Sequence, residues 1–158
     1  MKTRNAIRPG WLIVALIAVG ASLYPQNQTP PNPPPSAGPV INGLMWTGKD
    51  NGSDVTWNEA NSYCQNLRLG GYSDWRLPSI DELSAVYDPS KSDTFDYGFR
   101  PRTYHIKGGI KLSGWPWSGT RQDSGSAWDF FFSDGQRHSL PLDTPIHSRA
   151  LCVRRSGE

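Results

Sequence analysis

The stretch that decides the fold is GGYSDWRLPSIDEL, residues 70–83. Side chains alternate along an extended run, so Trp75 is expected to face the core while Asp74 and Arg76 point the other way. From that side Arg76 can reach a carboxylate such as Glu82 or a backbone carbonyl. Nothing in this stretch pairs a nucleophile with a base. We therefore interpret it as a structural latch, with a reaction centre as the alternative; the residues of the latch are Asp74, Trp75, Arg76, Leu77 and Pro78.

Capping boxes stand on both sides of the tryptophan. Thr56 and Glu59 predict the start of a helix, and Gly70-Gly71 is expected to end it. Ser79 and Glu82 predict the start of a second, short helix. The first helix has apolar residues at helical spacing, which predicts a buried face made of Trp57, Ala60, Cys64 and Leu67.

The rest of the domain is expected to be mostly strands. Residues 41–47 are predicted as one strand, 89–106 as a loop without period, and 108–120 as one or two strands broken by Pro116. Residues 126–142 are predicted as a hairpin around Ser133-Asp134-Gly135, and 148–155 as a closing strand with Ala150, Cys152 and Arg154 on one face. This order predicts an α+β fold with two helices packed on a small twisted antiparallel sheet with long loops.

The N-terminal segment predicts export. Three basic residues in the first ten are followed by an apolar run of 13 residues, Trp11–Leu23, which is shorter than the roughly 20 residues that span a bilayer. We expect a signal peptide over residues 1–24, and the alternative is an N-terminal anchor that is not cleaved. Such an anchor is the only attachment to a membrane that we expect. Residues 25–39 are expected to be a proline-rich linker and 40–158 the folded domain, located in the periplasm, on the cell surface or outside the cell.

The charge of the domain argues against nucleic acid as a partner. Three of the 16 basic side chains lie in the first ten residues, where no acidic residue occurs, so the domain is close to neutral. Its charge is nevertheless uneven. The stretch between Tyr97 and Gln122 has no acidic residue and contains five basic ones: Arg100, Arg102, Lys107, Lys111 and Arg121.

The two cysteines, Cys64 and Cys152, match no metal-ligand spacing. With an export signal upstream, one disulfide is favoured over two free thiols. Such a bond would stabilise the domain by about 4 to 5 kcal/mol, because it restricts the unfolded chain.

The order of these motifs resembles the bacterial family named after the C-terminal domain of the Legionella collagen-like adhesin. The resemblance rests on GLMWTGKDNGSDVTWNEANSYCQNLRLGGYSDWRLPSIDEL, GWPWSGT, AWDFFFSDGQ and ALCVR, and runs from about Asn42 to Arg154. It implies a C-type-lectin-like fold in which a cysteine on the first helix bonds to one on the final strand, the places of Cys64 and Cys152. It also implies an exported or surface protein, because the family is found on such proteins, and its adhesin namesake binds sulfated glycosaminoglycans. Trimerisation does not carry over, because residues 25–39 have no Gly-X-Y repeat.

No pattern predicts catalysis or a bound metal. Asp81 and Glu82 diverge on their helix, and Ser118 lacks the glycine of a nucleophile elbow. The acids of residues 88–96 lack the spacing of a calcium loop, so a solvated acidic loop is favoured over a calcium site and no cofactor is expected. The histidines His105, His138 and His147 are isolated from one another in the sequence.

Two functions remain. The first is a non-catalytic surface module that binds glycans or sulfated or acidic polymers. In this hypothesis Trp115 and Trp117 offer rings for sugar stacking and the five basic residues contact anionic groups. The alternatives are core packing for the tryptophans and a solvated face for the basic residues. The second function is an envelope protein-interaction or structural module without a small ligand.

Overall fold

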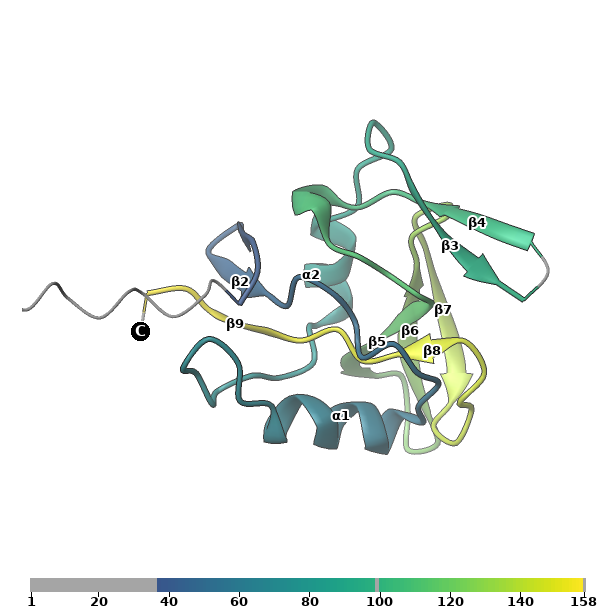
Figure 1. The fold of residues 1–158 in the computed structure, drawn as a ribbon. Coiled ribbons are helices and arrows are strands. Elements are labelled where there is room, and N and C mark those ends of the chain that lie inside the picture. The colour runs from purple at the N-terminus through teal and green to yellow at the C-terminus, as the bar shows by residue number, and fades with distance from the viewer. Residues whose placement is uncertain (1–36, 99, 158) are drawn as a thin grey trace, which may run out of the picture. The chain divides into compact units, whose positions relative to one another are not determined.

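The computed structural model describes residues 37–98 and 100–157. The expected signal or anchor segment, and all but the last three residues of the expected linker, lie outside these residues. The elements follow one another as β1 (Val40–Ile41), β2 (Leu44–Trp46), α1 (Trp57–Asn66), α2 (Ile80–Ala85), β3 (Asp93–Tyr97), β4 (Arg100–Tyr104), the 3-10 turn η1 (Lys107–Gly109), β5 (Trp115–Arg121), β6 (Ser126–Phe131), β7 (Gln136–Pro141), β8 (Ser148–Arg149) and β9 (Val153–Arg155) (Figure 1). Neither helix is long and apolar enough to cross a membrane, within the residues described.

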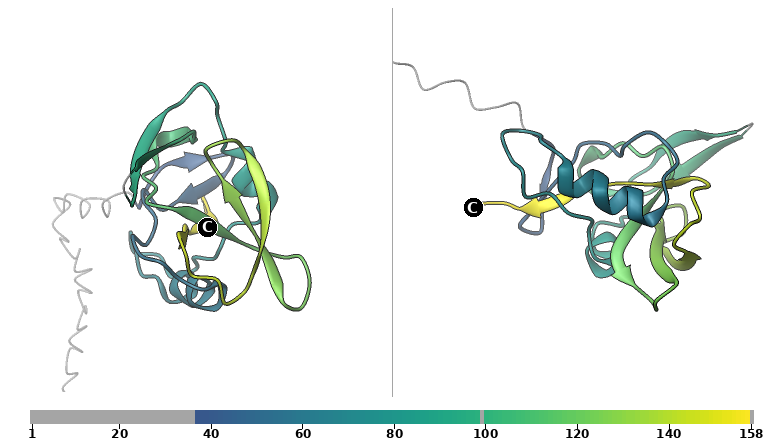
Figure 2. Two further views of the ribbon diagram at one scale, coloured as in Figure 1. Left: turned by 90° about the vertical axis from the view of Figure 1, so that its right-hand side faces the viewer. Right: turned by 90° about the horizontal axis from the view of Figure 1, so that it is seen from below.

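The predicted α+β class, with two helices and antiparallel strands, is confirmed, but the β structure is more extensive than expected. The strands form a three-stranded sheet in the order β1-β2-β9, a hairpin of β3 and β4, and a four-stranded sheet in the order β7-β6-β5-β8. Within the last sheet β5 and β8 run parallel. Figure 2 shows the β3–β4 hairpin extending from the body of the domain, whereas α1 lies along that body, where Ala60 and Cys64 pack in a core cluster with Trp117.

Both capping boxes form as predicted. Thr56 accepts a hydrogen bond from the Glu59 amide, and Glu59 accepts one from the Thr56 amide. Ser79 and Glu82 make the same exchange at α2. The prediction that Gly70-Gly71 ends α1 is wrong, because the helix ends at Asn66 and the next residue has an extended backbone. The two glycines, both with positive φ, instead make the turn between residues 69 and 72.

Three strand predictions need correction. Residues 41–47 form a hairpin rather than one strand, because Asn42 and Gly43 both adopt the positive φ of a tight turn. The expected loop over 89–106 contains the β3–β4 hairpin, whose partners run from Asp93 with Tyr104 to Tyr97 with Arg100. Pro116 does not break β5: it is the second residue of that strand, a position where a missing N–H is tolerated.

The closing segment also differs from its prediction. Residues 150–154 are all buried, so alternation does not separate a core face from a solvent face there. The segment divides into two short strands, β8 and β9, that belong to different sheets. It therefore passes through the interior of the domain, and both of its faces are covered.

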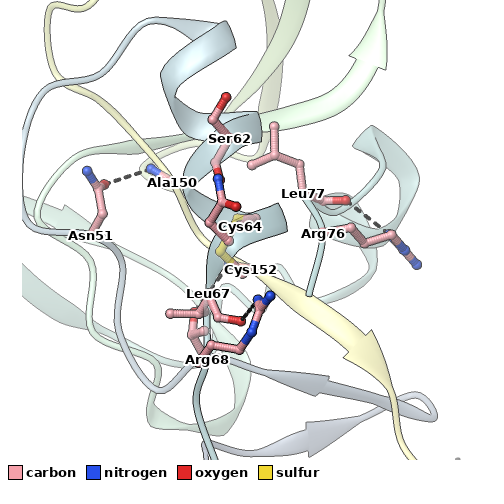
Figure 3. Close-up of a disulfide and its surroundings, with 11 residues drawn as sticks. Asn51, Ser62, Cys64, Leu67, Arg68, Arg76, Leu77, Ala150 and Cys152 are labelled. Atoms are coloured by element: carbon pink, nitrogen blue, oxygen red, sulfur yellow. Dashed lines mark hydrogen bonds between the residues drawn. A yellow bond between two sulfur atoms is a disulfide. The ribbon is translucent and has the colours of Figure 1, made fainter. Parts of the chain in front are cut away.

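The predicted disulfide between Cys64 and Cys152 is confirmed, with a sulfur–sulfur distance of 2.01 Å. Both residues are fully buried in a cluster with Trp75, Trp117 and Ala60. Figure 3 shows the bond between α1 and the closing segment, beside the hydrogen bond that joins Asn51 to Ala150. The disulfide thus joins the first helix to the last part of the chain.

The Asp74–Pro78 run makes the contacts that were expected of a latch. Trp75 is 2% exposed, and Arg76 donates two hydrogen bonds to Glu82, at 2.7 and 2.8 Å. Arg76 also exchanges backbone hydrogen bonds with Val153, and Asp74 accepts a hydrogen bond from Arg154 Nε at 2.7 Å. The run therefore ties α2 to the last strand around a buried indole.

Candidate functional site

The five predicted basic residues do not form one surface. Arg121 lies at the far end of β5, where its guanidinium donates to the carbonyl of Asp123 and lies 5.3 Å over the ring of Trp57. The start of β5 contacts the middle of β3 through the rings of Trp115 and Phe95. Six steps along a strand separate these ends, roughly 20 Å. Arg121 therefore lies apart from the other four.

Those four lie on or next to the β3–β4 hairpin. Arg100 and Arg102 are exposed on β4, with Arg100 at the end near the turn. Lys107 donates from Nζ to the carbonyl of Ala85 at 2.9 Å. Lys111 pairs with Asp93. Lys107 and Lys111 thus already have partners within the domain.

The expectation that Trp115 and Trp117 present rings for sugar stacking is wrong. Trp115 is 5% exposed and stacks on Phe131 at a centroid distance of 5.0 Å. Trp117 is fully buried, and its Nε1 donates to the carbonyl of Val55 at 2.9 Å. Both indoles fill the core, because their strand is covered on the side that they face.

The structure instead places a groove between α1, the loop of residues 47–52 and residues 111–113. Its volume is about 410 Å³, and we call it the Tyr63 groove. A second hollow of about 380 Å³ shares Lys49, Asp50, Tyr63 and Lys111 with it and continues along Asn51, Leu112 and Ser113. The groove is lined by Ala37, Thr47, Gly48, Lys49, Asp50, Tyr63, Leu67, Leu69 and Lys111.

An exposed aromatic ring stands in this groove. Tyr63 is 42% exposed and Leu69 37%, and both are among the few large apolar side chains of the described residues with this much exposure. Tyr63 and Leu67 are four residues apart across the end of α1, so they lie on the same side of it. The groove therefore combines an apolar wall with an accessible ring, the combination that sugar rings stack on.

The loop that forms the opposite wall is held rigidly. The Asp50 carboxylate accepts hydrogen bonds from the amide and the hydroxyl of Ser113, at 2.6 and 2.8 Å, and from the amide of Gly52 at 3.0 Å. Asn51 accepts a hydrogen bond from the amide of Ala150 at 2.7 Å. These contacts join three distant parts of the chain, so the groove is preformed and a ligand would not have to order the loop.

Two lysines stand side by side in the groove. Lys49 and Lys111 are partners in a parallel β-bridge, with backbone hydrogen bonds from Lys111 to Gly48 and from Asp50 to Lys111. Paired residues of a bridge point to the same side, so both ammonium groups can reach one ligand. Of the predicted basic residues, Lys111 lines the groove.

The two lysines differ in charge environment. Lys111 forms an ion pair with Asp93, whose pKa this hydrogen bond holds below its usual range, while the pKa of Lys111 is raised. Lys49 has no carboxylate partner among residues 37–98 and 100–157. The cation available to an incoming anion is therefore Lys49.

Sequence reasoning missed Lys49 and Tyr63. Lys49 stands in a polar loop, and Tyr63 lies beside Leu67 at the edge of the buried face of α1, outside the residues that carried the periodic signal. A large aromatic residue next to that face was the available signal for Tyr63.

Within the described residues, no group of three or more His, Cys, Asp or Glu side chains is placed to hold a metal ion. Two of the acids of residues 88–96 have partners within the domain: Asp88 accepts from the amide and hydroxyl of Ser90, and Asp93 pairs with Lys111. The Tyr63 groove itself combines an exposed ring, two lysines and a rigid wall.

Comparison with known proteins gives one family. A sequence model described as the Lcl C-terminal domain matches residues 40–154, which is most of the chain and nearly all of the described domain. No curated protein matches the sequence. The match confirms the resemblance found in the sequence and covers α1, the Trp75 latch, both cysteines and all residues of the Tyr63 groove except Ala37. The chain belongs to the Lcl C-terminal domain family.

Proposed function

We propose that this chain is an exported, non-catalytic binding module of the periplasm or cell surface that binds glycans or other acidic extracellular polymers in the Tyr63 groove. One observation carries the proposal: an exposed tyrosine ring and two adjacent lysines line the same preformed groove. The ring gives a stacking surface for a pyranose, and Lys49 gives a donor for a carboxylate or sulfate. No metal or other cofactor is part of this proposal.

The proposal includes a C-type-lectin-like fold and export. The disulfide from α1 to the closing segment and the two helices packed with antiparallel strands support the fold. A fully buried disulfide supports an oxidising compartment, where such bonds persist. Family membership supports a role at the cell surface, since the namesake domain belongs to an adhesin.

The test is retention of the secreted protein on immobilised polysaccharides: hyaluronan, heparin and the neutral polymer dextran. Tyr63→Ala should weaken binding about tenfold, which corresponds to about 1.4 kcal/mol for a lost stacking contact. Lys49→Ser should weaken binding to the two acidic polymers and leave any binding to dextran unchanged.

Matched controls remove similar groups elsewhere. Ile146→Ala truncates an apolar side chain that is 66% exposed, and Arg137→Ser removes an exposed cation on β7. Both controls should bind like the parent. If the parent binds no polysaccharide but a protein of the envelope binds it and loses that binding in Tyr63→Ala, the groove serves the protein-interaction function instead.

A further inference from the structure

The positive charge of the two lysines in the Tyr63 groove is nearly balanced by two nearby carboxylates. Asp93 pairs with Lys111, and the Asp50 carboxylate lies behind the wall, 6% exposed, with three donors around it. A cluster of cations would produce a field that draws a densely charged polymer, whereas a compensated site does not. The groove is therefore poorly matched to a chain with several sulfates on each sugar.

The groove does match a sugar with one isolated anionic group. Its wall supplies Tyr63, Leu67 and Leu69 for the apolar face of a sugar ring. Lys49 stands at the same groove without a carboxylate partner in the described part of the chain. One stacking face and one available cation together fit a pyranose that carries a single carboxylate.

We infer that Asp93 is a specificity-determining residue of the Tyr63 groove, because its ion pair with Lys111 selects glycans with isolated carboxylates over densely sulfated ones. This inference rests on the proposed function. Asp93 is the first residue of β3, and Lys111 follows η1, so the pair also links the β3–β4 hairpin to the groove. Both side chains are well exposed, at 41% for Asp93 and 68% for Lys111, so a variant can release the lysine without opening the core.

The experiment compares two polymers at several salt concentrations. Hyaluronan carries one carboxylate on every second sugar and no sulfate, whereas heparin carries several sulfates on each disaccharide. The parent should bind hyaluronan more tightly than heparin. Asp93→Asn should raise heparin affinity about fivefold at low salt, the upper end for one exposed ionic contact. It should also steepen the slope of log affinity against log salt by about 0.7 to 0.9, the counterion release of one further contact. Hyaluronan affinity should change by less than about twofold.

Two further variants make the result specific. Asp96→Asn removes a carboxylate from the same strand, at a position that alternates with Asp93, and should leave both affinities unchanged. Lys111→Gln should lower heparin affinity little in the parent but strongly in the Asp93→Asn background, because the lysine is released only there. Melting curves identify any variant that fails to fold, and if Asp93→Asn does so, Asp93→Ser replaces it in the same comparisons.

The failure of this inference can be told from that of the proposed function. If Tyr63→Ala abolishes hyaluronan binding but Asp93→Asn leaves the heparin affinity and the salt slope unchanged, the proposed function stands and the role of Asp93 is overturned. A parent that already prefers heparin overturns it too. If the parent binds neither polymer and no variant changes this, both are overturned.

Discussion

A buried carboxylate provides the sharpest test of the fold energetics. Asp129 lies on β6, is 1% exposed, and has no hydrogen-bond partner for either carboxylate oxygen within the described residues. Its cross-strand neighbours are Trp117 on β5 and His138 on β7, whose Nε2 is also buried without a partner. Burial raises the pKa of Asp129 to about 7, although its own backbone amide partly opposes the shift. The carboxyl therefore destabilises the fold when it is ionised.

The magnitude follows from linkage. The ordinary pKa is 3.8 and the folded value is about 7, so the folded state holds its proton to a higher pH than the unfolded chain does. Below pH 3.8 both states are protonated and no cost arises. Between pH 3.8 and 7 stability falls as the pH rises, and above pH 7 the full cost applies, about 4 kcal/mol at 1.36 kcal/mol per unit. Asp129→Asn should remove this cost and stabilise the domain by about 2 to 4 kcal/mol at pH 8, because a real site relaxes around a buried charge.

Urea denaturation of the oxidised protein between pH 4 and pH 8 measures the effect. The difference between Asp129→Asn and the parent should be near zero at pH 4 and should grow steadily up to about pH 7. Contributions from other carboxylates, such as those of Asp74 and Asp93, occur in both proteins and cancel in the difference. Asp143→Asn, at an exposed position, should show no such trend. A difference that does not change with pH, or an Asn variant less stable than the parent at pH 8, would refute the reasoning.

Three further predictions concern the latch and the disulfide. Reduction of Cys64–Cys152 should cost about 4 to 5 kcal/mol in urea denaturation; two free thiols in non-reducing mass spectrometry of secreted protein would contradict the bond itself. Trp75→Ala should cost about 3 to 5 kcal/mol, and an unchanged thermal midpoint would mean that the indole is not buried. Glu82→Gln keeps the cap but loses the charge of the Arg76 pair, so it should cost about 0.5 to 1 kcal/mol at pH 7. The hydrogen bond from Arg76 lowers the pKa of Glu82, so the ion pair stabilises the fold fully above the ordinary pKa of Glu82 and loses this effect as the pH falls through the lowered pKa. If Glu82→Gln is still destabilising by the same amount at pH 2, the result would argue against the ion pair.

The features that sequence predicted well are those with local or covalent causes. The capping boxes at Thr56 and Ser79 involve residues three apart, and both form. The hairpin of β6 and β7 surrounds a turn with Gly135 at positive φ. The disulfide could be predicted because a chain with two cysteines allows one pairing. The burial of Trp75 could be predicted because alternation in the single Asp-Trp-Arg run puts the indole on the side opposite the two charged residues.

The features that sequence missed depend on distant parts of the chain. The β3–β4 hairpin is rich in Asp, Arg, Thr and Pro and alternates weakly, yet Phe95 and Tyr104 anchor it by packing on the core. From the sequence, Trp115 and Trp117 could either stack on a sugar or pack in the core, because the residues that cover them come from distant parts of the chain. The Tyr63 groove brings together α1, Lys49 and Lys111, and the bridge between the two lysines joins segments 62 residues apart. No local pattern marks such a pairing.

The most direct test of the Tyr63 groove is an NMR titration of the isotope-labelled protein with short hyaluronan fragments. Shift changes at the backbone amides of Lys49, Tyr63 and Lys111, absent when Tyr63→Ala is titrated in the same way, are the predicted result. Shift changes confined to the strand Arg100–Tyr104 would contradict a glycan site in this groove. The absence of any shift change, at a fragment concentration high enough to displace the protein from immobilised hyaluronan, would contradict it too.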